Sequence, residues 1–141
     1  MASSLGVQLE ALTELIIGAA FTVSNTLGHG FLEAVYRNAL YEELSTRRVS
    51  VKKEKVFIIY YNGKQVGRYV ADIVVHEKVI VELKAVDRLN QAHGAQVLNY
   101  LKAANLGVGL LFNFGVPKVE VRRIINRSYF DTAAGTVFGE G

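Results

Sequence analysis

Two strongly apolar segments follow each other in this chain, and each carries charge in its middle. Residues 69–75 (Tyr-Val-Ala-Asp-Ile-Val-Val) contain Asp72, and residues 79–86 (Val-Ile-Val-Glu-Leu-Lys-Ala-Val) contain Glu82 and Lys84. Segments of this length that are rich in β-branched residues predict strands, and the short connection predicts an antiparallel pair. Charged side chains are costly in such segments unless they pair or serve a site. The fold therefore has to provide a buried sheet with charged groups inside it.

The length of the connecting turn decides where those charges meet. If residues 76–78 form the turn, Val75 pairs with Val79, and Asp72 lies directly opposite Glu82. Two facing carboxylates repel each other, but a hard divalent cation between them makes the arrangement favourable. A two-residue turn would place them on opposite faces. The pattern alone also fits a second interpretation, in which the two charges of the second segment form a salt bridge on an edge strand and Asp72 is solvated.

The rest of the chain alternates between helical and strand patterns. Apolar residues at helical spacing predict helices, β-branched and aromatic runs predict strands, and Asn62-Gly63 predicts a tight hairpin turn. The expected elements are helices over 7–27 and 30–47, strands over 55–61, 64–75 and 79–86, a helix over 91–104, and strands over 109–114 and 119–125. This order, α-α-β-β-β-α-β-β, predicts an α/β fold.

Composition limits the class of protein further. The chain has 141 residues, half of them apolar, which suits one domain over residues 1–130 followed by a flexible tail over 131–141. The absence of cysteine excludes disulfides and thiolate metal sites, and a net charge of +3 suits a polyanionic partner without requiring one. No apolar stretch reaches the length of a membrane span. We expect a cytoplasmic protein without a membrane partner.

Three motifs accompany the charged strands. Residues 30–36 have the form GxxExxY around Glu33, Asp72 is followed after nine residues by the ExK of Glu82-Leu83-Lys84, and residues 96–100 have the form QxxxY. With these motifs in this order, the chain resembles the GxxExxY protein family, a branch of the PD-(D/E)XK nuclease superfamily, from its first helix to about Ile125. The resemblance implies a restriction-endonuclease-like core, with a mixed central sheet flanked by helices.

The same resemblance implies roles for six residues. Glu33, Asp72 and Glu82 would bind Mg²⁺ or Mn²⁺, and Lys84 would assist the attacking water. Gln96 and Tyr100 lie four residues apart, on one helix face, and would orient Lys84 or a substrate phosphate. The implied activity is metal-dependent hydrolysis of nucleic acid, DNA in preference to RNA.

Structural explanations remain open for several of these residues. Glu33 also fits a first-turn glutamate favoured by the helix dipole, and Tyr36 and Tyr100 also fit core packing with a satisfied hydroxyl. For His93, a structural role is favoured. Tyr60, Tyr61 and Phe57 on the hairpin could stack on bases or pack at a homodimer interface. The alternative for the whole chain is a non-catalytic nucleic-acid-binding or scaffold protein that keeps the nuclease fold.

Overall fold

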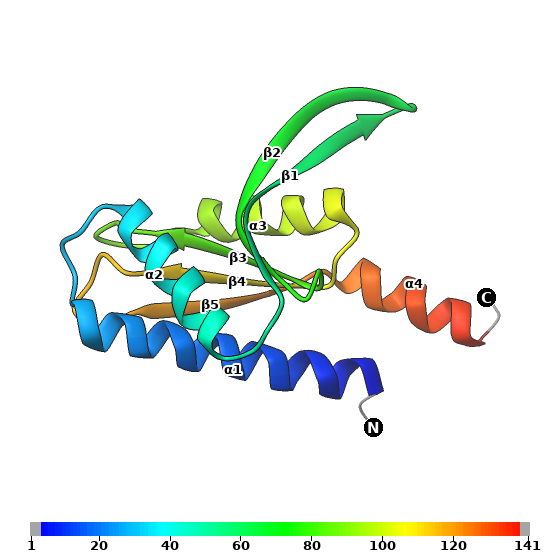
Figure 1. Ribbon diagram of the computed structural model, residues 1–141. Coiled ribbons are helices and arrows are strands. Elements are labelled where there is room, and N and C mark those ends of the chain that lie inside the picture. The colour runs from blue at the N-terminus through cyan, green and yellow to red at the C-terminus, as the bar shows by residue number, and fades with distance from the viewer. Residues whose placement is uncertain (1–3, 139–141) are drawn as a thin grey trace.

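The computed structural model describes residues 4–138 and contains a five-stranded mixed sheet with helices on both faces (Figure 1). The strands lie in the order β1-β2-β3-β4-β5; β3 and β4 are parallel, and the other neighbours are antiparallel. The elements are α1 (Ser4–Leu27), α2 (Glu33–Thr46), β1 (Val51–Tyr61), β2 (Lys64–Val75), β3 (Val79–Lys84), α3 (Gln91–Ala104), β4 (Val108–Asn113), β5 (Glu120–Ile125) and α4 (Arg127–Phe138). The predicted order is confirmed as far as β5.

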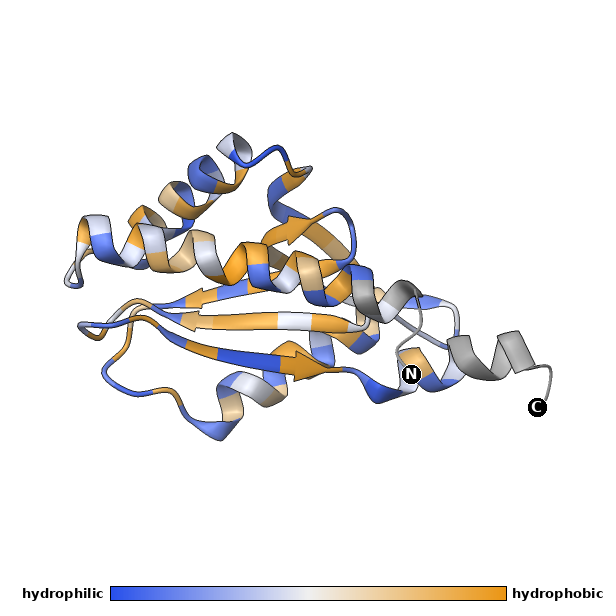
Figure 2. Cartoon of the chain, turned by 90° about the horizontal axis from the view of Figure 1, so that it is seen from below, coloured by the Kyte–Doolittle hydropathy of each residue, from blue (hydrophilic) through white to orange (hydrophobic). Residues whose placement is uncertain are grey.

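The sheet separates two hydrophobic cores. Val79, Val81 and Leu83 of β3 pack with α1 and α2, whereas Ile80 packs with α3 on the other face. This alternation is the one expected for a strand that is buried on both sides. The edge strand β5 is mostly exposed and has charged residues at three of its six positions, whereas β4 is buried throughout, and Figure 2 shows this difference in hydropathy. No helix among the described residues is long and apolar enough to cross a bilayer.

The β1–β2 hairpin projects beyond the central sheet. Only residues 73–75 of β2 pair with β3, and the rest of the strand pairs with β1 alone. Asn62 and Gly63 both have positive φ, 51° and 75°, as the predicted hairpin turn requires. Figure 1 shows the hairpin curving away from the sheet on the side of α3.

Both strands of the hairpin become irregular at the same level. Ile73 belongs to the core under α1 and α2, but Ala71, two residues earlier, belongs to the core under α3, so the strand changes face at Asp72. In β1, Glu54 has φ 57°, and the β1–β2 ladder lacks a pair between Glu54 and Asp72. The hairpin therefore leaves the sheet at Asp72.

The sequence patterns did not predict α4. Its residues are small or glycine over much of its length, and we expected a tail over 131–141. The backbone is helical as far as Phe138, and residues 139–141 lie outside the described part of the chain. Phe130, near the start of α4, packs against the core under α1 and α2.

Candidate active site

Asp72 and Glu82 face each other where β2 and β3 stop pairing. Val75 pairs with Val79, which confirms the three-residue turn, and the last ladder pair is Ile73 with Val81. One step further, the backbone N–H of Asp72 donates to Glu82 Oε2 at 3.0 Å. The backbone N–H of Leu83 donates to Asp72 Oδ2 at 2.9 Å. Two carboxylates thus replace a pair of backbone acceptors. The edge-strand interpretation is wrong, because β3 is the central strand of the sheet.

Each of these carboxylates keeps one oxygen that is not bound in this way. Asp72 Oδ1 and Glu82 Oε1 accept neither of these two backbone N–H groups; Arg37 Nη1 lies 3.9 Å from Asp72 Oδ1. Glu82 is buried, with 7% of its surface exposed, and the Asp72 side chain is 16% exposed. The two strands therefore present paired carboxylate oxygens in a shielded position.

The charges of three acidic residues are coupled in this region. Burial and the neighbouring charge of Asp72 raise the pKa of Glu82 to about 8. Burial raises the pKa of Asp72, against the opposing effects of the Leu83 N–H, Arg37 and Lys84. Burial and Asp72 also raise the pKa of Glu33, so the first residue of α2 belongs to the same electrostatic neighbourhood. Nearby positive charge does not fully compensate these carboxylates.

Such a donor set suits a hard divalent cation. Carboxylate oxygens are the ligands that Mg²⁺ and Mn²⁺ prefer, and a cation would relieve the repulsion between the acids. Within residues 4–138, no group of three His, Cys, Asp or Glu side chains already converges as a metal site. Asp72 and Glu82 offer oxygens side by side, and the role of Glu33 as a third ligand stays a prediction.

Tyr36 fixes the loop that leads to Glu33. Its hydroxyl donates to the Gly28 carbonyl at 2.7 Å and accepts from the Phe31 N–H at 3.2 Å. Its ring is fully buried and stacks on Phe114, with centroids 4.8 Å apart. The core-packing explanation of this tyrosine is the one that the structure shows. Its packing ties the start of α2 to the sheet and thereby places Glu33.

Lys84 ends β3, two residues after Glu82 and opposite Asn113 of β4. Asn113 was not predicted as a residue of the site. A polar residue within an apolar strand is the sequence feature from which it could have been predicted. Its fully buried amide accepts from the N–H groups of Val86 and Gly115 and donates to the Val86 carbonyl and to Glu120 Oε1, at 2.9–3.0 Å. These bonds fix the backbone that follows Lys84.

The backbone is crowded at this point. A Cβ atom at Gly115 would lie 2.4 Å from the Val86 nitrogen, so only glycine allows the two segments to approach. The strand end that carries Lys84 is therefore held by close packing as well as by hydrogen bonds.

Tyr100 lies in an aromatic stack that joins α3 to the hairpin. Its ring stacks on Tyr69 with centroids 3.7 Å apart, and Tyr69 stacks on Phe57 at 5.2 Å. Burial and the nearby charge of Glu82 raise the pKa of both tyrosines, which places them beside the acidic pair. A hydrogen bond from Gln96 partly offsets this rise at Tyr100.

His93 has a structural role at the start of α3. Its Nδ1 accepts from the Asn90 N–H, and its own N–H donates to Asn90 Oδ1, both at 3.1 Å. These two bonds form a capping box, in which the histidine replaces the usual glutamate or glutamine. The structural explanation favoured for this residue is confirmed.

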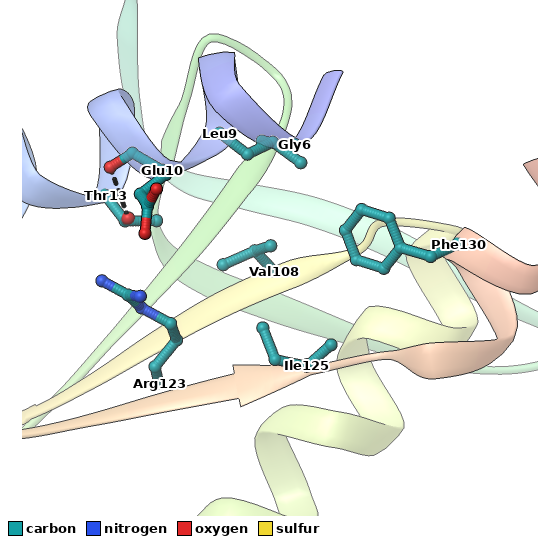
Figure 3. Close-up of a pocket in the computed structure, with 8 residues that line it drawn as sticks. All are labelled: Gly6, Leu9, Glu10, Thr13, Val108, Arg123, Ile125 and Phe130. Atoms are coloured by element: carbon teal, nitrogen blue, oxygen red, sulfur yellow. Dashed lines mark hydrogen bonds between the residues drawn. The ribbon is translucent and has the colours of Figure 1, made fainter. Parts of the chain in front are cut away.

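A cavity of about 270 Å³ lies at the other end of the sheet. It is lined by residues of α1, β4, β5 and α4, including Leu9, Val108, Arg123 and Phe130 (Figure 3). Val108 pairs with Val79 at the start of β3, whereas the acidic residues lie near the end of that strand. This cavity is therefore separate from the acidic pair.

Comparison with known proteins supports a nuclease-type fold. The crystal structure of SSO0001 is similar to this chain, with a TM-score of 0.54 and 17% sequence identity, over 74% of this chain and 56% of that one. The chain thus spans about half the length of that protein. A search of curated proteins gave no significant match. The family model of the PD-(D/E)XK nuclease superfamily matches residues 10–124. The chain therefore belongs to the PD-(D/E)XK nuclease superfamily.

Proposed function

We propose that this protein is a metal-dependent nuclease that hydrolyses phosphodiester bonds at the Asp72–Glu82 pair. The observation that carries the proposal is the reciprocal bonding of these two residues, in which Asp72 Oδ1 and Glu82 Oε1, on adjacent strands, accept neither backbone N–H. Superfamily membership supports the nuclease activity. Asp72, Glu82 and Glu33 would hold Mg²⁺ or Mn²⁺, which when bound lowers the pKa of water and neutralises charge on the phosphoryl group.

Lys84, Gln96 and Tyr100 would assist the hydrolysis directly. In the reaction, the oxygen of water bonds to phosphorus and the water gives up a proton, while the bond from phosphorus to the leaving sugar oxygen breaks and that oxygen takes up a proton. The ammonium of Lys84 would donate a hydrogen bond to the attacking water and stabilise the negative charge that develops on the phosphoryl oxygens. Tyr100, whose pKa is raised by burial and by the nearby charge of Glu82, and Gln96, which lies beside it on α3, would orient Lys84 or the substrate phosphate.

Finer features of the proposal have separate support. The GxxExxY motif of residues 30–36 supports placement in the GxxExxY family. DNA is proposed as the substrate in preference to RNA by analogy with the superfamily. The exposed side chains of Tyr60, Tyr61 and Val66 at the end of the hairpin support a homodimer, and the absence of cysteine supports a cytoplasmic location.

The structure offers no specific observation in favour of the non-catalytic alternative. That alternative predicts that the two acids turn away from each other, or that Lys84 is held in a remote ion pair. The acids face each other, and among the described residues the Lys84 ammonium makes no hydrogen bond or ion pair.

Cleavage assays with matched variants test the proposal. We expect the wild-type protein to cleave members of a panel of single- and double-stranded DNA and RNA with Mg²⁺ or Mn²⁺, and EDTA to stop the reaction. Asp72→Asn, which keeps an acceptor for the Leu83 N–H, and Lys84→Met should each lower the rate by roughly 100-fold or more.

Lys78→Met is the control, because Lys78 is an exposed lysine in the turn before the same strand. It should retain the wild-type rate. The absence of metal-dependent cleavage across the whole panel would reject the activity, and an equal loss in the control would reject the role of Lys84.

A further inference from the structure

Arg37 brings a positive charge to the edge of the acidic pair. It lies one helical turn after Glu33 on α2, and its side chain is 21% exposed. Its Nη2 is 3.2 Å from Glu54 Oε1, whereas its Nη1 is 3.9 Å from Asp72 Oδ1, beyond hydrogen-bond distance. Its Nε is buried and has no acceptor among the described residues. The guanidinium is thus bound closely to Glu54 and only loosely to Asp72.

Glu54 makes this contact from an unusual backbone conformation. Its φ is 57°, in the left-handed region, which is strained for a residue with a Cβ atom. It lies in β1 at the level of Asp72, between the ladder pairs of Lys53 with Ile73 and of Lys55 with Ala71. The strand therefore gives up a ladder pair at the position where its glutamate reaches Arg37.

We infer that Glu54 is a positioning residue of the site: it holds the Arg37 guanidinium away from the metal-facing oxygen of Asp72. This inference rests on the proposed function. At 3.9 Å the guanidinium still compensates part of the charge of Asp72. If Glu54 did not hold it, a small rotation would bring it to about 2.8 Å and close a charge-assisted hydrogen bond to Oδ1. That bond would occupy the oxygen and bring a positive charge next to the incoming cation.

Mn²⁺ binding separates this role from a purely structural one. Calorimetric titration of Mn²⁺ alone, without substrate, compares wild type, Glu54→Gln and the double variant Arg37→Gln/Glu54→Gln. We expect Glu54→Gln, whose neutral amide holds the guanidinium less firmly than the carboxylate, to bind Mn²⁺ about tenfold more weakly, a loss of about 1.4 kcal/mol. The double variant should return to within about threefold of wild type, because the guanidinium that competes for Asp72 is gone.

Two further variants control for charge and stability. Glu77→Gln removes an exposed glutamate in the turn between β2 and β3, which pairs with Lys55 of β1 at 3.7 Å, and it should bind Mn²⁺ like wild type. Glu54→Gly removes the carboxylate and also relieves the left-handed strain, so it should unfold no more readily than wild type in the absence of metal. It should nevertheless show the same weakened Mn²⁺ binding as Glu54→Gln.

The outcomes distinguish this inference from the function on which it rests. If wild type fails to bind Mn²⁺, the proposed metal site and this inference are both rejected. If wild type binds Mn²⁺ and Glu54→Gln binds it equally well, only the inference is rejected. A double variant as weak as Glu54→Gln would also overturn it, because the loss would then not act through Arg37.

Discussion

At the scale of single residues, buried polar groups fix the positions of the candidate catalytic side chains. The Tyr36 hydroxyl bonds to both the Gly28 carbonyl and the Phe31 N–H, in the loop that leads to Glu33. Asn113 performs a similar task after Lys84. In both places an uncharged side chain closes a loop whose backbone groups would otherwise lack partners. The geometry of the acids and the lysine therefore depends on neighbours that take no part in the chemistry.

Tyr36→Phe tests this dependence. The substitution keeps the ring but removes the hydroxyl, leaving one acceptor and one donor without their partner. We expect the free energy of unfolding, measured with urea, to fall by about 1–2 kcal/mol. Tyr41→Phe is the matched control on the same helix, because the Tyr41 hydroxyl makes no hydrogen bond within residues 4–138, and it should be neutral. Equal effects of the two substitutions would show that the hydroxyl does not hold the loop.

The site residues whose positions depend on strand register could be predicted from the sequence. Those whose positions depend on an irregular strand could not. The opposition of Asp72 and Glu82 follows from a turn length and a period of two, both of which can be read from the chain. Arg37 and Glu54 could not be found in this way, because the positive φ of Glu54 and the break in its ladder arise from the bend of the hairpin. Glu33 was identified through the family motif, and its distance from the pair is a matter of helix packing.

At the scale of elements, the junction of β2 and β3 concentrates negative charge inside the sheet. Glu82 is buried on a central strand, and its pKa is raised from the ordinary 4.5 to about 8, by burial and then by Asp72. The folded protein therefore holds a proton there that the unfolded chain releases at lower pH. Burial raises the pKa of Asp72 and of Glu33 in the same direction.

The stability of the metal-free protein should depend on pH accordingly. Because the folded state binds more protons than the unfolded state between pH 4.5 and about 8, stability should be greatest at the acidic end and fall as pH rises through this range. Urea midpoints at pH 5, 6, 7 and 8 measure the effect. Glu82→Gln should flatten the profile, because the amide still accepts from the Asp72 N–H and does not titrate. A wild-type profile that rises over this range would contradict the assignment.

At the scale of the whole molecule, a long hairpin is attached to the central sheet by few contacts. Beyond Asp72, β2 pairs only with β1, and the stack of Phe57, Tyr69 and Tyr100 connects the hairpin to α3. The Tyr69 hydroxyl also donates to the Tyr100 carbonyl at 3.2 Å. The sequence predicted the hairpin and its turn, but not the direction in which it projects, because that direction depends on aromatic contacts between distant segments.

Tyr100→Leu should loosen the hairpin without unfolding the protein. Losing the stack should raise the amide exchange rates of residues 57–69 by roughly tenfold, while β3 and β4 keep their protection. Hydrogen-exchange mass spectrometry measures both regions in one experiment. Tyr61→Leu, near the exposed end of the hairpin, provides the comparison and should leave exchange unchanged. Faster exchange throughout the sheet in Tyr100→Leu would mean that the stack supports the whole domain.

The exchange of bonds between Asp72 and Glu82 also has an evolutionary consequence. The bonds of these two acids follow the last ladder pair of β2 with β3, so the acids have a structural role that does not depend on nuclease activity. A descendant that had lost its activity would still need a side-chain oxygen at both positions to accept these two backbone N–H groups. The Lys84 ammonium makes no hydrogen bond or ion pair among the described residues, so selection would have no structural reason to preserve it. If Lys84 acts in catalysis as proposed, relatives that have lost the activity should vary at this position while they keep a side-chain acceptor at the other two.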